Sequence, residues 1–304
     1  MKLSVVILNW NRKGDTKECV DSLLKSNLKK DEIEIIVVDN GSTDGSEEEL
    51  KKIKTNGFSY EVIPTGKNLG FAAGNNVGIK HALNHDSKYI FILNNDTVVH
   101  EDLIENLLKA SLEHPQAGIL TPKIYFTKGF EFHKNNYKKE ETGKILWYAG
   151  GEIDWDNVYG KNIGVDEPDR GQYNTQQPVD FATGAAMFIK SDAIKKTGMF
   201  DEKYYMYLED ADLSIRMKKN GFEVVYIPEA RLWHKVSQSS RIGSELNDYY
   251  ISRNRMLFGL KYASPRTKAA LFRESIKLLN KGRKWQRLGI RDFYLFRFGK
   301  GSWK

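Results

Sequence analysis

The chain has 304 residues, of which 40% are hydrophobic and 29% are charged, and this composition excludes a wholly disordered protein. Its length allows one large α/β domain or two smaller ones. The single cysteine, Cys19, excludes an internal disulfide framework and any metal site built from several cysteines, so it is expected to pack inside a helix of a cytoplasmic protein.

The net charge of +7 is concentrated at the C-terminal end. Residues 266–304 contain twelve Lys and Arg against two Asp and Glu, a net charge of +10, so the other 265 residues together carry −3. A local basic segment predicts a local anionic partner such as a membrane surface, and not a nucleic acid. The apolar residues interleaved with these charges suit a helix at an anionic lipid surface, or a solvated basic helix packed on the main domain.

Membrane insertion and export are not indicated by the hydropathy pattern. No apolar run approaches the roughly 18 residues that a spanning helix needs. The run at residues 5–8 is too short for a signal-peptide core and leads directly into the polar Asn9. We therefore expect a cytoplasmic protein, held peripherally at the inner face of the cell membrane by its basic tail.

Short apolar runs alternate with helical patterns in the first part of the chain. Strands are predicted at residues 3–8, 33–38, 60–64 and 89–93. Helices are predicted at residues 15–26 and 71–83, with a further helix starting at Ser46, where Ser46 and Glu49 resemble a capping box. This βαβ rhythm predicts an α/β fold with a doubly wound, mostly parallel sheet.

The second half of the chain is less regular. Residues 126–178 mix aromatic, charged and glycine residues with weak periodicity, which predicts long loops or a small inserted sheet. Beyond them, strands are predicted at residues 181–189 and 224–227, and helices at residues 207–220 and 245–260.

Polar residues follow three of the predicted strands, at the edge where such sheets bind ligands. Asp96, after Asn94 and Asn95, can hold a hard divalent cation that bridges a diphosphate, or it can cap the next helix. Asp39, with Ser42 three residues later, can accept a hydrogen bond from a nucleotide base or a ribose, or it can form a turn into the next helix.

A glycine-rich segment spans residues 66–78. Its small residues open a predicted helix whose N-terminal amides can bind a diphosphate, with Lys67 adding a positive charge. Tight packing of the helix on the sheet explains the same glycines equally well.

Three carboxylates, Glu209, Asp210 and Asp212, cluster in the first turn of a predicted helix. They can complement the helix dipole, or one of them can act as a general base that takes the proton of an attacking hydroxyl. His234 is either a structural histidine or a second ligand of a metal at Asp96.

These motifs, in this order and spacing, resemble the inverting family 2 glycosyltransferases with a GT-A fold, and most of all a rhamnosyltransferase-like group that builds bacterial surface polysaccharides. The matching segments are residues 5–11, 37–46, 68–75, 93–96, 183–185, 200–202, 209–213, 233–235 and 249–254. The resemblance implies a GT-A domain over residues 1–265, with a nucleotide-sugar-binding half at 1–125 and an acceptor and catalytic half at 126–265. Residues 266–304 would form a basic amphipathic helical extension.

The resemblance also implies roles for single residues. Asp210 would be the catalytic base, Asp39 would contact the nucleotide base, and Asp96 would bind Mg²⁺ or Mn²⁺ with His234 as a further metal or diphosphate contact. Asn94 stands where the family's Asp-x-Asp motif begins with aspartate, so it is assigned to the donor instead. The expected donor-binding set is Asn9, Asn11, Asp39, Ser42, Lys67, Asn68, Gly70, Asn75, Asn94 and Asn95. The expected acceptor side comprises Thr183, Gly184, Glu209, Trp147 and Trp155. The two tryptophans belong to the aromatic segment 125–173, whose rings can stack on sugars, although core packing explains them equally well.

The expected function is therefore metal-dependent, inverting transfer of a sugar, with rhamnose favoured by the resemblance, from a dTDP- or UDP-linked donor to a saccharide or lipid-linked acceptor. A homodimer is a further expectation. Two alternatives stay open: a non-catalytic nucleotide-sugar or carbohydrate-binding protein, and a nucleotide-sugar pyrophosphorylase. A pyrophosphorylase should carry a Gly-rich basic loop after its first strand, where this chain has a single glycine, Gly14.

Overall fold

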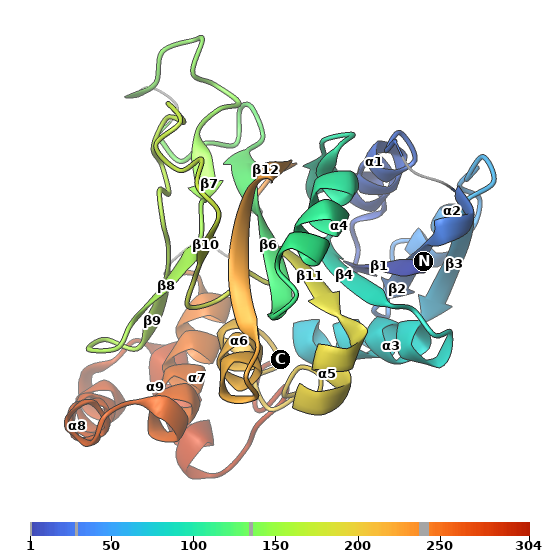
Figure 1. The fold of residues 1–304 in the computed structure, drawn as a ribbon. Helices are drawn as coiled ribbons and strands as arrows, with labels where there is room; N and C mark the ends of the chain where they lie inside the picture. The colour runs from blue at the N-terminus through green and yellow to red at the C-terminus, as the bar shows by residue number, and fades with distance from the viewer. Residues whose placement is uncertain (1, 28–29, 134–135, 237–242) are drawn as a thin grey trace.

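The computed structural model describes residues 2–27, 30–133, 136–236 and 243–304 (Figure 1). Among these residues, ten strands form one mixed sheet whose main path runs β10-β12-β6-β11-β4-β1-β2-β3, with β5 and β7 pairing at its side. One large hydrophobic cluster is built on this sheet and on the helices that cover it.

The strands β3 (Ser59–Pro64), β2 (Ile33–Asp39), β1 (Leu3–Asn9) and β4 (Tyr89–Asn94) form a parallel block. All seven residues of β2 and six of the seven in β1 are buried, because both faces of a parallel sheet are covered by helices. The four strands predicted in the first part of the chain are confirmed to within one residue.

Three helices flank this block. The helices α1 (Lys13–Leu23) and α2 (Ser46–Leu50) lie on one side of the strands, and α3 (Gly70–Asn84) lies on the other (Figure 1). The helix expected to start at Ser46 does start there, but without the predicted capping box. The preceding Gly45 has a φ of 77°, and the carboxylate of Asp44 accepts hydrogen bonds from the amide and the hydroxyl of Ser46. A single 3₁₀ turn (Lys30–Glu32) precedes β2.

The other half of the sheet is built from β6 (Ala117–Phe126), β11 (Ala186–Lys190) and β12 (Glu223–His234), covered by α4 (Leu103–Glu113) and α5 (Ser191–Thr197). β11 is antiparallel to both of its neighbours, which the sequence did not indicate. It begins five residues later than predicted because the amide of Ala186 closes a turn on the carbonyl of Thr183, 3.1 Å away. β12 has twelve residues instead of the predicted four.

The irregular middle of the chain contains long loops and short strands, as predicted. These strands are β7 (Leu146–Tyr148), the hairpin β8 (Gly151–Asp154) and β9 (Tyr159–Asn162), and β10 (Gln177–Pro178). One further short strand, β5 (Thr97–Val99), follows β4 directly and pairs with the end of β12.

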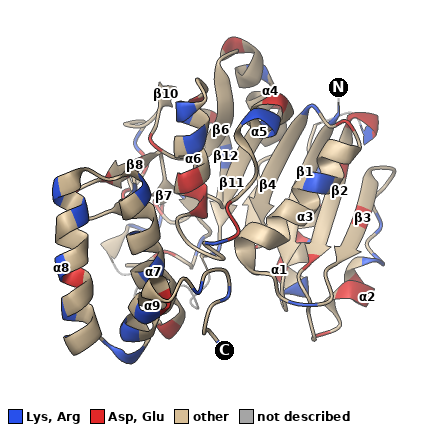
Figure 2. Ribbon diagram, turned by 90° about the horizontal axis from the view of Figure 1, so that it is seen from below, with Lys and Arg blue, Asp and Glu red and all other residues tan. Residues whose placement is uncertain are grey.

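The helix α6 (Glu209–Lys219) packs on β12 and β6, next to α5. The helices α7 (Glu245–Tyr262), α8 (Pro265–Lys281) and α9 (Lys284–Tyr294) pack on one another and form a layer beside the sheet. Lys and Arg residues are spread along α7 to α9 (Figure 2). No helix in the described ranges is long and apolar enough to cross a bilayer.

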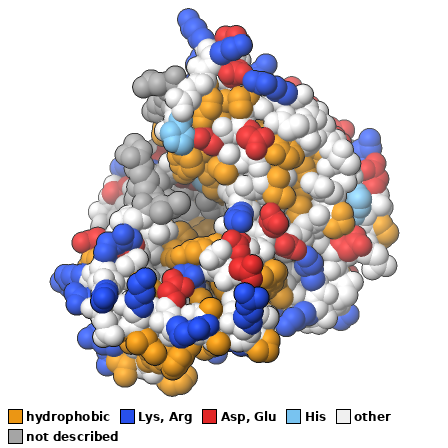
Figure 3. Space-filling model, turned by 90° about the vertical axis from the view of Figure 1, so that its left-hand side faces the viewer, with side chains coloured by type: hydrophobic (Ala, Val, Ile, Leu, Met, Phe, Trp, Pro, Cys, Tyr) orange, Lys and Arg blue, Asp and Glu red, His pale blue; other side chains and the backbone are white. Residues whose placement is uncertain are grey.

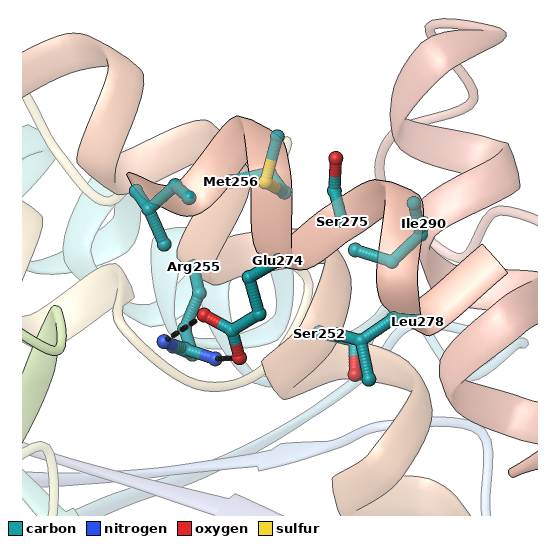
Figure 4. Close-up of a pocket in the computed structure, with 8 residues that line it drawn as sticks. Ser252, Arg255, Met256, Glu274, Ser275, Leu278 and Ile290 are labelled. Atoms are coloured by element: carbon teal, nitrogen blue, oxygen red, sulfur yellow. Dashed lines mark hydrogen bonds and ion pairs between the residues drawn. The ribbon is translucent and has the colours of Figure 1, made fainter. Parts of the chain in front are cut away.

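The guanidinium of Arg255 on α7 binds both carboxylate oxygens of Glu274 on α8, at 2.9 and 3.1 Å (Figure 4). A cavity of about 10 Å³ remains beside this pair, between α7, α8 and α9, which is room for roughly one water molecule. It is therefore a packing defect and not a ligand site.

Two glycines provide a matched test of how tightly α3 packs on β1. A Cβ atom on Gly78 would lie 2.3 Å from Cγ1 of Val6, whereas a Cβ atom on Gly14 in α1 would meet nothing within 4 Å. We expect Gly78→Ala to lower the free energy of unfolding by about 1–3 kcal/mol through overpacking, and Gly14→Ala to leave it unchanged or slightly raised. Urea unfolding followed by circular dichroism checks this; equal stability of the two variants would contradict the close contact.

Candidate functional site

A cavity of about 500 Å³ lies at the carboxyl ends of β1 and β4 and extends under α6 and the start of α7. This is the edge at which doubly wound sheets bind ligands. Eleven residues predicted for the site line it: Asn68, Gly70, Asn94, Asn95, Asp96, Trp147, Thr183, Gly184, Glu209, Asp210 and His234.

Asp96 and His234 form a buried pair on the wall of this cavity. Pairing of β5 with β12 sets Thr97 opposite His234, and the histidine Nε2 lies 2.9 Å from Oδ1 of Asp96. Burial alone would raise the pKa of Asp96, but the charge and hydrogen bond of His234, with a smaller effect of Arg12, hold it below its usual value. The carboxylate therefore stays ionised.

The Asp96–His234 pair suits a divalent cation. Its donor set joins a hard oxygen to an imidazole nitrogen at the cavity wall, and the other ring nitrogen of His234, Nδ1, is buried with no hydrogen-bond partner among the described residues. Mg²⁺ and Mn²⁺ are commonly held by one or two protein ligands and completed by substrate phosphates. The residues present thus fit such an ion when a diphosphate shares it.

The three carboxylates at the start of α6 have different environments. Asp212 is fully buried, and its oxygens accept hydrogen bonds from Arg216, Lys261 and Tyr262 at 2.7 Å each. Its pKa is lowered, because these partners more than offset the effect of burial. Asp212 is therefore a structural anchor between α6 and α7.

Asp210 is oriented toward the cavity by two backbone amides. Its carboxylate accepts hydrogen bonds from the backbone N–H of Gly184, at 2.9 Å, and from the backbone N–H of the next residue, Ala211, at 2.8 Å. Burial raises its pKa, and these two hydrogen bonds offset only part of that effect. A half-buried carboxylate that is fixed in one orientation and has a raised pKa suits a general base.

Glu209 is buried beside Asp210, and its Oε2 has no hydrogen-bond partner among the described residues. Burial and the charge of Asp210 raise the pKa of Glu209 well above its ordinary value. A buried carboxylate with an unused oxygen on a cavity wall can bind a ligand hydroxyl.

The segment before α6 has an unusual backbone. Tyr205, Tyr207 and Leu208 have φ angles of 65°, 70° and 71°, a region that non-glycine residues rarely adopt. The side-chain amide of Asn254 on α7 donates to three carbonyls of this segment, and the buried Arg253 donates to two. These bonds fix where α6 begins.

Four residues predicted to bind the donor, Asn9, Asn11, Ser42 and (for the nucleotide base) Asp39, form a hydrogen-bonded cluster outside the cavity lining. Asp39 is 2% exposed and accepts hydrogen bonds from the side chain of Asn9 at 2.8 Å and from the amide of Ser42 at 2.9 Å. The side-chain oxygen of Asn11 accepts a hydrogen bond from the amide of Thr43. In this structure the cluster joins the ends of β1 and β2.

The glycine-rich segment packs closely on its neighbours, which was the alternative to diphosphate binding. The amides of Leu69 and Gly70 donate to the side chains of Asn40 and Asn68, and those of Phe71 and Ala72 donate to the carbonyl of Tyr205. These four amides are therefore not free for a diphosphate, so that interpretation of the α3 N-terminus is wrong.

Three other predicted residues are absent from the cavity lining. Lys67 is exposed, and Asn75 is buried within α3 and donates to the carbonyl of Phe71. Trp155 stacks on Phe258 at a ring distance of 6.0 Å, so it packs against α7 and not at the cavity.

Several lining residues were not predicted. Trp10 and Arg12 adjoin Asn9 and Asn11 at the end of β1, so their position in the sequence could have identified them. Tyr205 and Tyr207 belong to the segment before α6, and Trp303 comes from the chain end, where no sequence pattern marked it.

Comparisons with known proteins agree with this geometry. The family model described as "Glycosyl transferase family 2" matches residues 4–197. The chain is 27% identical over 220 residues, 68% of either chain, to an N-acetylglucosaminyl-diphospho-decaprenol L-rhamnosyltransferase of Mycobacterium tuberculosis. It is 23% identical over 257 residues, 84% of this chain and 74% of the other, to the low-salt glycan biosynthesis hexosyltransferase Agl10 of Haloferax volcanii.

Among solved structures, the mannosyltransferase PcManGT from Pyrobaculum calidifontis, in complex with GDP-Man and Mn²⁺, superposes with a TM-score of 0.57 at 15% identity. The match covers 97% of this chain and 74% of that one. The expected GT-A fold is thereby confirmed.

The raised pKa of Glu209 predicts a pH-dependent effect on stability. The folded state favours the protonated carboxyl of Glu209. The stability of the protein with respect to this group is therefore highest below the pKa that Glu209 has in the unfolded chain, and it falls as the pH rises through the pKa of Glu209 in the folded protein. We expect Glu209→Gln to be more stable than the wild type at pH 8, with the difference shrinking toward pH 4. Thermal unfolding across this range checks it, with the exposed Glu48→Gln as control; a pH-independent difference would contradict it.

Proposed function

The chain belongs to glycosyl transferase family 2, and from that premise we propose that it moves one sugar from a nucleoside-diphosphate donor to a hydroxyl of a saccharide or lipid-linked saccharide. One observation carries the proposal: the oriented carboxylate of Asp210 and the Asp96–His234 pair line the same cavity. Similarity to a rhamnosyltransferase favours rhamnose from a dTDP- or UDP-linked donor, in surface polysaccharide synthesis.

In the proposed reaction, Asp210 accepts the proton of the acceptor hydroxyl as that oxygen attacks the anomeric carbon. The amides of Gly184 and Ala211 hold the carboxylate in place, and its raised pKa makes it a stronger base than an exposed aspartate. Attack from the face opposite the leaving group inverts the anomeric centre. A Mg²⁺ or Mn²⁺ held by Asp96 and His234 would neutralise the charge that develops on the diphosphate.

We assign the donor and the acceptor to different walls of the cavity. Asn68, Gly70, Asn94 and Asn95 belong to the donor half, residues 1–125. The acceptor side belongs to residues 126–265 and comprises Trp147, Thr183, Gly184 and Glu209. Asp39 uses its carboxylate oxygens for two hydrogen bonds, and a carboxylate has about four acceptor positions, so it can still accept one from a nucleotide base.

Replacing the proposed base tests the assignment. Asp210→Asn should bind the donor as the wild type does but lose about 10²–10⁴-fold in kcat, because the amide cannot accept the proton. Asp192→Asn on α5 is the matched control. Donor-binding calorimetry and release of nucleoside diphosphate measure the two effects, and near-normal turnover of Asp210→Asn would show that another group is the base.

The pH profile gives a second test of the same carboxylate. Because burial raises the pKa of Asp210 above its ordinary value of 3.8, the base becomes protonated, and kcat falls, at a higher pH than for an exposed aspartate. We expect the acid limb of the wild-type kcat profile to be missing from the residual activity of Asp210→Asn. An acid limb kept by this variant would assign that titration to another group.

The products separate this function from its alternatives. A transferase releases nucleoside diphosphate with no pyrophosphate, a pyrophosphorylase releases or consumes pyrophosphate, and a binding protein releases neither. A panel of nucleotide sugars with and without Mn²⁺ and acceptor therefore decides the reaction class.

We also propose that α8 carries the protein to an anionic membrane surface. Phe272, Ile276 and Leu279 follow each other at helical spacing and are 51%, 46% and 36% exposed, while Leu271 and Ser275 face the neighbouring helices. Figure 3 shows the face of the molecule that lies on the left in Figure 1; in its lower part, lysine and arginine side chains gather around exposed hydrophobic groups. Apolar insertion flanked by basic side chains is typical of peripheral binding to anionic lipid, here at the inner face of the membrane.

A sedimentation assay with vesicles that contain anionic lipid tests the membrane proposal. The triple variant Phe272→Ser, Ile276→Ser and Leu279→Ser should remain in the supernatant, whereas the wild type should sediment with the vesicles at low salt. Leu112→Ser, which removes a 73% exposed leucine on α4, is the control. Equal partitioning of the triple variant and the wild type would exclude α8 as the docking element.

A further inference from the structure

A cluster of imidazole and carboxylate groups lies away from the cavity, where the C-terminal end of α3 covers β2 and β3. Glu34, His81 and His85 each offer one ligand atom, and these three atoms lie within 4.8 Å of one another. Nearby, Oε2 of Glu61 on β3 lies 3.4 Å from Nε2 of His81. No step of the proposed transfer uses these residues.

The distances within the cluster suit a shared cation better than direct hydrogen bonds. Nε2 of His81 lies 3.5 Å from Oε1 of Glu34 and 3.4 Å from Oε2 of Glu61, beyond the usual range for an N–H···O bond. Two ligands of a tetrahedral Zn²⁺, each about 2.0–2.2 Å from the ion, are separated by about 3.4 Å. That nitrogen is also buried without a hydrogen-bond partner in the described part of the chain.

The groups around these ligand atoms orient them. Oε2 of Glu34 accepts the Ser4 hydroxyl at 2.9 Å and lies 3.5 Å from the Lys2 ammonium, which leaves Oε1 directed at His81. Nδ1 of His85 lies 2.9 Å from the carbonyl of His81, so that its proton can be donated there and Nε2 keeps a lone pair. A backbone acceptor on the second ring nitrogen is the usual support of a metal-ligating histidine.

We infer that Glu34, His81 and His85 bind one Zn²⁺ ion. Two imidazoles on successive turns of a helix and one carboxylate favour zinc over Mg²⁺ or Mn²⁺. Such an ion ties the C-terminal end of α3 to β2. Gly70, at the opposite end of the 15-residue α3, lines the cavity, and a helix of this length spans about 20 Å, so the zinc site is separate from the cavity.

Zinc titration of the chelator-treated full-length protein tests this inference. We expect saturable binding of one Zn²⁺ by calorimetry, together with a higher thermal unfolding temperature. Loss of an outer-shell group typically weakens metal binding 10–100-fold, so His85→Gln, which removes a direct ligand, should weaken it by about that factor or more. Because His85 is exposed, this variant should fold normally.

Two controls make the result specific. His133→Gln removes an exposed histidine outside the cluster and should bind zinc as the wild type does. Asp96→Asn should also keep the site, which separates it from any zinc held at the cavity. Failure of the wild type to bind zinc, or equal binding by His85→Gln, would overturn the inference and leave His81 as an ion-pair partner of the two glutamates.

Discussion

The arrangement of the site depends on how α7 holds the segment before α6. Left-handed backbone at a non-glycine residue costs of order 1–3 kcal/mol, and this segment contains three such residues. The side chains of Arg253 and Asn254 offset that cost by satisfying the buried carbonyls that the distorted backbone presents. The carbonyl of Tyr205 in turn accepts the first amides of α3. One pair of residues on α7 therefore fixes the starts of two helices that border the cavity.

This constraint explains why neighbouring carboxylates of one helical turn behave differently. Asp212 is satisfied by Lys261 and Tyr262 on α7 and by Arg216, one turn further along α6. Asp210 points to the cavity and has only backbone donors, while Glu209 keeps one oxygen unused. Their pKa values shift in opposite directions for that reason. The helix dipole acts on all three, so it cannot distinguish them; the local partners do.

The sequence predicted the buried strands well, because a strand covered on both faces leaves a continuous apolar run. It predicted β12 too short, because this strand continues through Glu229 and Arg231, which are exposed and end the apolar pattern. Asp96, Asp210 and His234, which line the cavity, could be singled out because each lies at the end of an element. Asp39 and most glycines of the 66–78 segment lie outside the cavity lining, where local hydrogen bonds and close packing surround them.

Most contacts between distant segments were beyond the reach of sequence patterns. Glu34 and His81 are 47 positions apart, and neither a motif nor a period connects them; only the packing of α3 on β2 brings them together. Asp96 and His234 are 138 positions apart; they were expected at one metal, but the pairing of β5 with β12 that brings them together was not predicted. The sheet thus positions the proposed metal ligands, whereas the helical layer positions the proposed base. The relative placement of these two parts sets the distance between the proposed base and the proposed metal ligands, so Arg253 and Asn254 would act on the proposed reaction through the position of α6.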